Sequence, residues 1–256
     1  MSTGLRILKF GSSVLERPED YRAVAVEVRT EIEKGNKVVA VVSAMGGTTD
    51  ELLAAVNAVT QTPPHALLVS LLATGEEASV ALLSMALAAK GVRATEFTAA
   101  ELPVYTRGPL EDADPVRVDT DTIMAALESA DAVVVPGFLG MDGTGVPSLL
   151  GRGGSDLTAL FLGHVLDAEV RLVKDFDGIY PQDPRLVPDA VPFRFLSWEG
   201  VNRIGGDVVQ VKAVDFAERH QLGFRVTALG GTGTWVGPLA ARGQNPPGIR
   251  PAMHPG

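Results

Sequence analysis

The chain of 256 residues contains no cysteine, which excludes several kinds of chemistry. Disulfide bonds, thiolate catalysis and cysteine-ligated zinc or iron–sulfur sites all need thiols. The four histidines, His65, His164, His220 and His254, lack the spacing of a metal site, so no protein metal ligands are expected. No G-x-G-x-x-G pattern follows the first predicted strand, which argues against a dinucleotide-binding dehydrogenase. The chemistry must use carboxylates, amines, hydroxyls and backbone amides.

Positive charge is also scarce, with 22 Lys and Arg against 31 Asp and Glu and a formal net charge of −9. Because polyanions are bound mainly by an excess of Lys and Arg, no nucleic-acid partner is expected. The N-terminus has no long apolar segment, and no uninterrupted apolar run reaches the roughly 18 residues that a membrane span needs. We therefore expect a soluble, cytoplasmic protein with no membrane partner.

Short apolar β-branched runs alternate with longer helical patterns along the chain. The strand candidates are residues 5–10, 37–43, 131–138 and 169–175. Helical patterns at 21–35 and 76–91 stop at Gly35 and Gly91, which suit helix C-termini. This alternation predicts an α/β fold, a three-layer α/β/α sandwich with a mainly parallel central sheet. Ligands bind at the carboxyl edge of such sheets, so polar loops after the strands are the candidate site.

Two segments depart from this alternation. Residues 106–121 are polar and interrupted by proline, which predicts a surface excursion or a lid. Residues 241–256 are rich in Pro and Gly and are expected to form a flexible tail. With 46% hydrophobic residues, the chain can bury a large core as one domain or two closely joined lobes.

The first candidate loop follows the first strand. Lys9 is followed by a flexible glycine and two hydroxyl residues, Gly11, Ser12 and Ser13. A lysine charge and backbone N–H donors are what phosphoryl oxygens require. A strand that simply turns at these residues explains the same pattern equally well.

The second candidate loop, residues 43–49, follows the next strand. Its small residues let the backbone approach a charged ligand, and the hydroxyls of Ser43 and Thr49 can hydrogen-bond a carboxylate. The competing explanation is that Thr48 or Thr49 is only a helix N-cap.

The third loop places Glu76 at the mouth of a helix predicted to begin near Glu77. Its carboxylate could pair with a ligand ammonium group, although the helix dipole alone also favours an acid there.

Residues 151–156 are the strongest local signal. Glycines at a helix N-terminus expose amide donors to an anion, Arg152 can hold a carboxylate by two hydrogen bonds, and Asp156 can orient Lys9. The competing explanation is a flexible glycine turn with a solvated arginine.

Residues 174–185 combine turn formers with Tyr180 and Arg185, which fits either nucleotide binding or a simple turn.

Taken together and in this order, these segments resemble the catalytic region of aspartate kinases, within the amino acid kinase family, over about residues 5–228. The family's lysine motif corresponds to residues 9–13, its second loop to residues 42–50 and its glutamate motif to residues 74–76. Its substrate loop corresponds to residues 136–138 together with 150–156, and its nucleotide loop to residues 175–185. The resemblance implies ATP-dependent phosphorylation of the L-aspartate side chain to 4-phospho-L-aspartate. It also implies Mg²⁺ on the ATP phosphates and a homodimer.

The resemblance further implies a role for each matching residue. Lys9 would stabilise the phosphoryl group during transfer, Asp156 would help to position it, and Arg152 would hold the amino-acid carboxylate. The remaining aspartate-pocket residues would be Ser43, Thr49, Glu76, Phe138 and Ser155. The ATP contacts would be Gly11, Ser12, Ser13, Lys174, Asp175, Tyr180 and Arg185. The acceptor carboxylate is already ionised at neutral pH and needs no general base.

The same resemblance implies a kinase domain over residues 1–240, with an amino-acid-binding lobe at about 1–165 and an ATP-binding lobe at about 166–240. The tail follows at 241–256. The paired regulatory ACT domains that usually follow in this family are not expected, nor is feedback inhibition through them. The expected partners are small molecules, the amino acid and ATP.

Two departures from the family pattern leave alternatives open. The sequence Gly-Ser-Ser at residues 11–13 is closer to the glutamate 5-kinase branch, which allows another acidic amino acid as the acceptor. Asp207 stands where aspartate kinases have a nucleotide-contacting lysine. Lys174 or Lys212 could replace that charge, or both are solvated surface lysines. A catalytically inactive ligand-binding subunit is the third hypothesis.

Overall fold

A computed structural model describes residues 4–187, 189–204 and 208–238, through which one eight-stranded sheet runs. The strand order is β10-β12-β11-β9-β1-β2-β6-β3, so β1 (Leu5–Phe10) lies between β2 (Lys37–Val42) and β9 (Glu169–Val173). The other strands are β3 (Ala94–Glu96), β6 (Ala132–Pro136), β10 (Phe195–Leu196), β11 (Phe224–Thr227) and β12 (Thr234–Val236). In this sheet β11 and β12 pair antiparallel, and the other pairs are parallel.

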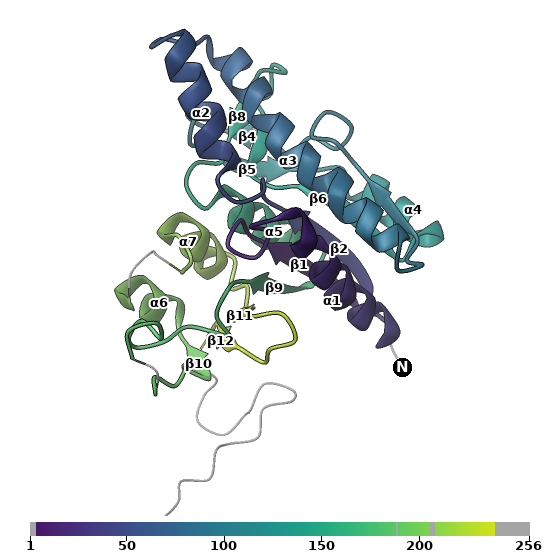
Figure 1. Cartoon of the computed structure of the whole chain (residues 1–256), viewed down its shortest axis with the longest axis vertical. Helices are drawn as coiled ribbons and strands as arrows, with labels where there is room; N and C mark the ends of the chain where they lie inside the picture. The colour runs from purple at the N-terminus through teal and green to yellow at the C-terminus, as the bar shows by residue number, and fades with distance from the viewer. Residues whose placement is uncertain (1–3, 188, 205–207, 239–256) are drawn as a thin grey trace, which may run out of the picture.

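Helices cover both faces of the sheet (Figure 1). On one face α1 (Tyr21–Glu33) packs beside α3 (His65–Ala88), and on the other α5 (Gly154–Val165) packs beside α7 (Val211–Arg219). The remaining helices are η1 (Pro18–Asp20), α2 (Thr48–Val59), α4 (Thr120–Ser129) and α6 (Trp198–Ile204). The predicted three-layer α/β/α sandwich with a mainly parallel sheet is confirmed.

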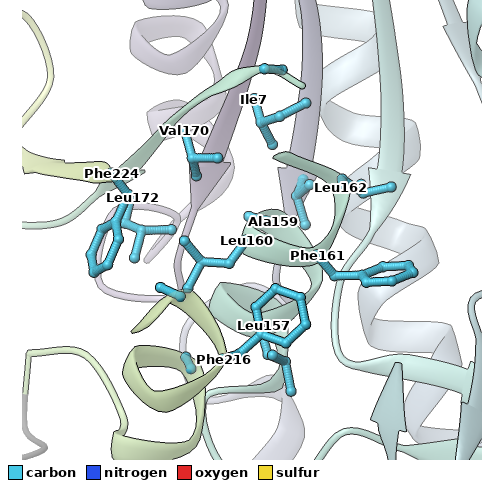
Figure 2. Packing of buried hydrophobic residues seen from close by; sticks show 14 of the residues in the cluster. Ile7, Leu157, Ala159, Leu160, Phe161, Leu162, Val170, Leu172, Phe216 and Phe224 are labelled. Carbon is cyan, nitrogen blue, oxygen red and sulfur yellow. The ribbon is translucent and has the colours of Figure 1, made fainter. Parts of the chain in front are cut away.

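Figure 2 shows the core between the sheet and α5. Ile7 of β1 and Leu172 of β9 belong to one buried cluster with Leu160 of α5, and Phe216 of α7 joins it from outside. The next residue along β1, Leu8, belongs instead to the cluster under α1 and α3, as the alternation of side chains along a strand requires. Because α5 is buried along most of its length, its N-terminus is held firmly at the carboxyl edge of the sheet.

A second, four-stranded sheet lies beside the main one, and it corrects one prediction. Its strands are β4 (Tyr105–Arg107), β5 (Asp114–Arg117), β7 (Leu139–Met141) and β8 (Pro147–Leu149). Most residues of the segment 106–121 are exposed, as a surface excursion predicts, but β5 and the end of β4 lie in it, so the segment is paired into a sheet and is not a lid. Strands of three or four residues are too short to show the alternation of apolar and polar residues that marks a strand. Thr106 is a polar residue, yet it is buried, and its Oγ1 forms a hydrogen bond with Ser148 Oγ at 2.7 Å.

The long helix α3 also corrects a prediction. It begins at His65, immediately after Pro64, and not near Glu77, so Glu76 lies in the middle of the helix. Gly75 does not interrupt it. A Cβ there would lie 3.1 Å from Thr48 and 3.2 Å from Ala44, so this glycine lets α3 approach the loop after β2. By length and composition α3 could cross a membrane, and in this structure it packs against α1 and β6 and buries Glu76.

Candidate active site

The loops after β1, β2, β6 and β9 meet at the carboxyl edge of the sheet, where they line two adjoining cavities. Cavity A, of about 320 Å³, is lined by Lys9, Ser43, Thr49, Glu76, Phe138, Arg152, Ser155 and Asp156, among others. Cavity B, of about 560 Å³, is lined by Lys9, Gly11, Ser12, Ser13, Lys174, Asp175, Tyr180 and Arg185, among others. Every site residue that the family resemblance implies therefore lines at least one of the two cavities. Lys9, Ser12 and Lys174 line both.

A buried cluster of three charges stands where the cavities meet. Lys9 Nζ lies 2.7 Å from Asp156 Oδ1, and Lys174 Nζ lies 2.7 Å from Asp156 Oδ2. Lys9 and Asp156 are only 5% and 3% exposed. Two ammonium groups share one carboxylate, so the cluster carries a net positive charge in a place that water hardly reaches. Such a charge is costly unless an anion neutralises it, so the cluster favours an anionic ligand.

The electrostatics of the cluster agree with this arrangement. Burial alone would raise the pKa of Asp156, but the ammonium groups of Lys174 and Lys9 outweigh it and lower the pKa to about 2. Burial, followed by the charge of Lys174, lowers the pKa of Lys9, while Asp156 acts in the opposite direction. Asp156 is therefore a permanent anion that holds the two lysines in fixed positions.

Gly11 explains why the Lys9 ammonium can lie against the loop that follows β1. A Cβ at position 11 would come within 2.8 Å of Lys9 Nζ, closer than real contacts allow. The glycine thus leaves room for the ammonium group beside the backbone of the residues that line cavity B.

Glu76 forms an acidic position in the wall of cavity A. It is 4% exposed, and among the described residues no group hydrogen-bonds its Oε2. Burial raises its pKa to about 8, although the Ala44 backbone N–H and the charge of Lys9 act in the opposite direction. Glu76 lines cavity A, and a buried carboxyl group with an unsatisfied oxygen is suited to bind a cationic group of a ligand.

Phe138, which also lines cavity A, is held in an unusual backbone conformation. Its φ of 67° lies in the left-handed region, which a phenylalanine seldom adopts. The conformation is fixed because Phe138 N–H donates to Thr158 Oγ1 at 3.1 Å and Leu150 N–H donates to Phe138 O at 2.9 Å. Gly137 allows the close approach to α5, because a Cβ there would lie 2.5 Å from Ser155 Cβ. Strained residues of this kind often mark functional sites.

The glycine turn before α5 is the N-terminus that the sequence predicts. Gly153, with φ of 69°, is the N-cap residue, and Ser155 and Asp156 lie in the buried first turn, while Arg152 is exposed at the rim of cavity A. The helix N-cap explanation for residues 48 and 49 is wrong, because Gly47 is the N-cap of α2.

Cavity B is lined mainly by the segment after β9. The Arg185 guanidinium lies 5.4 Å from the centre of the Phe176 ring, and Tyr180 packs edge-on against that ring. Asp183 accepts from Arg185 Nε at 3.0 Å. These contacts give the segment an aromatic and cationic surface of the kind that binds a nucleotide.

Several lining residues were missed by the sequence analysis. Val208 lines both cavities, Gln210 and Ala44 line cavity A, and Phe176 and Ile204 line cavity B. Apolar and amide side chains in loops carry no chemical pattern, and only the tertiary fold brings them to the site.

The structure separates the two lysines, Lys174 and Lys212, that could replace the nucleotide-contacting lysine absent at position 207. Asp207 itself lies outside the described residues, as do residues 241–256 of the expected tail. Lys174 lines both cavities, whereas Lys212 lines neither and binds Asp112 instead.

Among the residues that the structure describes, no group of three or more His, Asp or Glu residues could hold a metal ion.

The amino acid kinase family matches residues 4–227 of the chain, and the chain belongs to this family. Its similarity is to aspartokinases in particular. It is 37% identical to the aspartokinase of Pseudomonas aeruginosa over 226 residues, which are 87% of this chain and 55% of that protein. The aspartokinase of Corynebacterium glutamicum is likewise 37% identical over 227 residues, 87% of this chain and 54% of that protein. The chain thus spans about half the length of these relatives.

Solved structures agree with this assignment. The aspartate kinase from Synechocystis superposes with a TM-score of 0.78 at 31% identity, covering 93% of this chain and 41% of that one. Aspartokinase III of E. coli in complex with aspartate and ADP gives a TM-score of 0.79 at 21% identity, covering 93% of this chain and 65% of that one. At that identity the second likeness shows the fold alone.

Proposed function

We propose that this chain transfers the γ-phosphoryl group of ATP to the side-chain carboxylate of L-aspartate, giving 4-phospho-L-aspartate and ADP. The observation that carries this proposal is the buried cluster of Lys9, Lys174 and Asp156 at the junction of the two cavities. Cavity A would hold the acceptor and cavity B the nucleotide. A division into an amino-acid-binding lobe at about 1–165 and an ATP-binding lobe at about 166–240 stays a prediction, as does a homodimer.

The transfer needs positioning and charge neutralisation more than proton chemistry. A carboxylate oxygen of the acceptor forms the new bond to the γ-phosphorus, and the bond from that phosphorus to the bridging oxygen of ADP breaks. The acceptor is already ionised at neutral pH, so no base is required. Lys9 and Lys174 would neutralise oxygens of the group in transfer, which reduces the repulsion between two anions.

The residues of cavity B fit a magnesium ion that arrives with ATP. Mg²⁺ in such sites is held largely by phosphates and water with one or two carboxylates, and Asp175 lines the cavity as a candidate oxygen ligand. When bound, the ion would neutralise phosphate charge. The protein residues would orient the nucleotide and keep the acceptor in line with it.

Cavity A offers groups for both ends of an α-amino acid. Arg152 at the rim could bind the α-carboxylate, and Glu76 in the wall could bind the ammonium group. The similarity to aspartokinases supports aspartate as the acceptor. The side chain would then point to Lys9.

The proposal is tested by incubating the protein with Mg-ATP and L-aspartate and trapping the acyl phosphate with hydroxylamine. We expect aspartate-dependent hydroxamate together with release of ADP. Hydroxamate formation with glutamate and none with aspartate would show that the acceptor is glutamate and not aspartate. A melting temperature that rises when ligand is added, without ADP release in the presence of any acidic amino acid, would support a catalytically inactive ligand-binding subunit.

Glu76 gives the acceptor site a specific pH dependence. Because its pKa in the ligand-free protein is about 8, binding of the substrate ammonium group must expel a proton at lower pH. We expect the KM for aspartate to fall by up to about tenfold per pH unit between pH 6 and 8 and then to level off. Steady-state kinetics with Glu76→Gln should show a high KM without this slope.

The same residue affects stability in the opposite sense. A carboxyl whose folded-state pKa is raised from 4.5 to about 8 stabilises the fold below 4.5 and loses that contribution as the pH rises through 8. Glu76→Gln should therefore melt at a higher temperature than the wild type at pH 7.5, without ligand. Glu77→Gln, one residue along α3 and outside cavity A, is the control. Equal melting temperatures for wild type and Glu76→Gln would contradict a buried ionisable Glu76.

A further inference from the structure

Lys212, in the first turn of α7, reaches across to the segment between β4 and β5. Its ammonium group donates to Asp112 Oδ1 at 2.7 Å, to Asp112 O at 2.9 Å and to Ala113 O at 3.0 Å. It also donates to Leu150 O at 3.3 Å. One side chain from α7 therefore gathers oxygens from two other segments of the chain.

Leu150 is the residue that immediately precedes the glycine turn of cavity A. The two segments are also joined by their backbones, since Ala113 N–H donates to Leu149 O at 2.8 Å and Leu149 N–H donates to Leu110 O at 2.6 Å. The Lys212 ammonium lies at the point where these segments meet. It therefore fixes the end of β8, from which the turn starts.

Two side chains, those of Asp112 and Gln210, pack closely against the glycines of the turn. A Cβ at Gly151 would fall 2.0 Å from Asp112 Oδ1, and a Cβ at Gly153 would fall 2.5 Å from Gln210 Cγ. Both glycines have positive φ, of 76° and 69°. Asp112 and Gln210 thus form the support on which the turn rests, and Lys212 holds the carboxylate of Asp112 in place.

We propose that Lys212 is a positioning residue that fixes the glycine turn carrying Arg152 and Ser155, and that it thereby sets the affinity for the acceptor. This inference rests on the proposed function for its kinetic consequence. Lys212 lines neither cavity A nor cavity B, so it acts through the turn and not by touching either substrate.

The position of Lys212 in the chain also connects the two cavities. It follows Val208, which lines both cavities, and Gln210, which supports Gly153. A segment that touches cavity B is thereby tied to the turn of cavity A. The alternative, in which Lys212 supplies a charge to the nucleotide, requires it to leave four oxygens that it already binds.

The decisive variants are Lys212→Met, which keeps the length of the side chain and removes its donors, and Lys212→Arg, which keeps charge and donors. We expect Lys212→Met to raise the KM for aspartate by about tenfold or more, because the unpaired oxygens loosen the turn, and to leave the KM for ATP within about twofold. Lys212→Arg should recover most of the aspartate affinity. Lys90→Met, an exposed lysine just after α3, is the matched control.

Amide hydrogen exchange of ligand-free protein tests the same idea without any turnover. In Lys212→Met, exchange over residues 149–154 should become faster, including Gly154 N–H, which donates to Gly151 O at 3.0 Å in the folded turn. Unchanged exchange there would overturn the proposal, as would a larger effect on the KM for ATP than on that for aspartate. If the wild type does not use aspartate, the proposed function fails, and the exchange measurement alone decides the role of Lys212.

Discussion

Lys9→Met is expected to lower kcat by roughly 10²–10³-fold while the protein stays folded. The substitution keeps the length and apolar volume of the side chain and removes the ammonium group from the junction of the two cavities. Asp156 keeps Lys174 as a partner at 2.7 Å, so the buried carboxylate is not left without a counter-charge. The loss should appear in kcat more than in the KM of either substrate, because a charge that acts on the transferring group stabilises mainly the transition state.

The measurement is hydroxamate formation under saturating Mg-ATP and aspartate, with the melting temperature as the test of folding. Lys90→Met again serves as the control, since that lysine is exposed and lines neither cavity. A Lys9→Met protein that melts like the wild type and retains more than about a tenth of its kcat would exclude Lys9 from the transfer step.

Asp156→Asn is expected to damage both activity and stability. The amide has nearly the shape of the carboxylate but no charge, so Lys9 and Lys174 would face each other across it, 2.7 Å from its two polar atoms. Removing one partner from a buried ion pair costs about 3–5 kcal/mol. For a domain of this size that corresponds to a fall in melting temperature of about 6–20 °C.

The pattern of kinetic change would distinguish positioning from simple unfolding. In Asp156→Asn the two lysines repel each other and attract phosphate more strongly, so kcat should fall by about 100-fold or more while the KM for ATP does not rise. Asp121→Asn, an exposed acid in the first turn of α4, is the control. Loss of activity confined to a higher KM for ATP would show that Asp156 serves nucleotide binding instead.

The sheet could be predicted from the sequence because its central strands are buried on both faces. β2 and β6 appear as nearly continuous apolar runs and β1 and β9 as mainly apolar ones, and the polar loops that follow parallel strands must meet at one edge. That single rule brings Lys9, Ser43 and Phe138 into one region before any coordinates are known. Glu76 and Asp156 do not follow a parallel strand, and only the family's order of motifs assigns them to the same site. The strands β4, β5, β7 and β8 are too short to carry such a signal.

The rest of the site depends on tertiary contacts that no local pattern records. The left-handed backbone of Phe138 is fixed by Thr158, twenty positions away in the sequence, and nothing near residue 138 announces it. The place of Glu76 in the middle of α3 was missed because Gly75 looks like a helix boundary, although here it serves close packing. The contacts of Lys212 cross about 60 and 100 positions of sequence.

The wall that the two cavities share has a consequence for inhibitor design. Lys9, Ser12, Lys174 and Val208 line both cavities, so an occupant of one cavity lies no more than one side chain away from an occupant of the other. A single molecule that joins an acidic amino acid to adenosine through a short phosphate chain could fill both at once. Linking the two halves makes the second binding event intramolecular, with an effective concentration in the millimolar range for a short flexible link. Such a conjugate would bind far more tightly than either half alone.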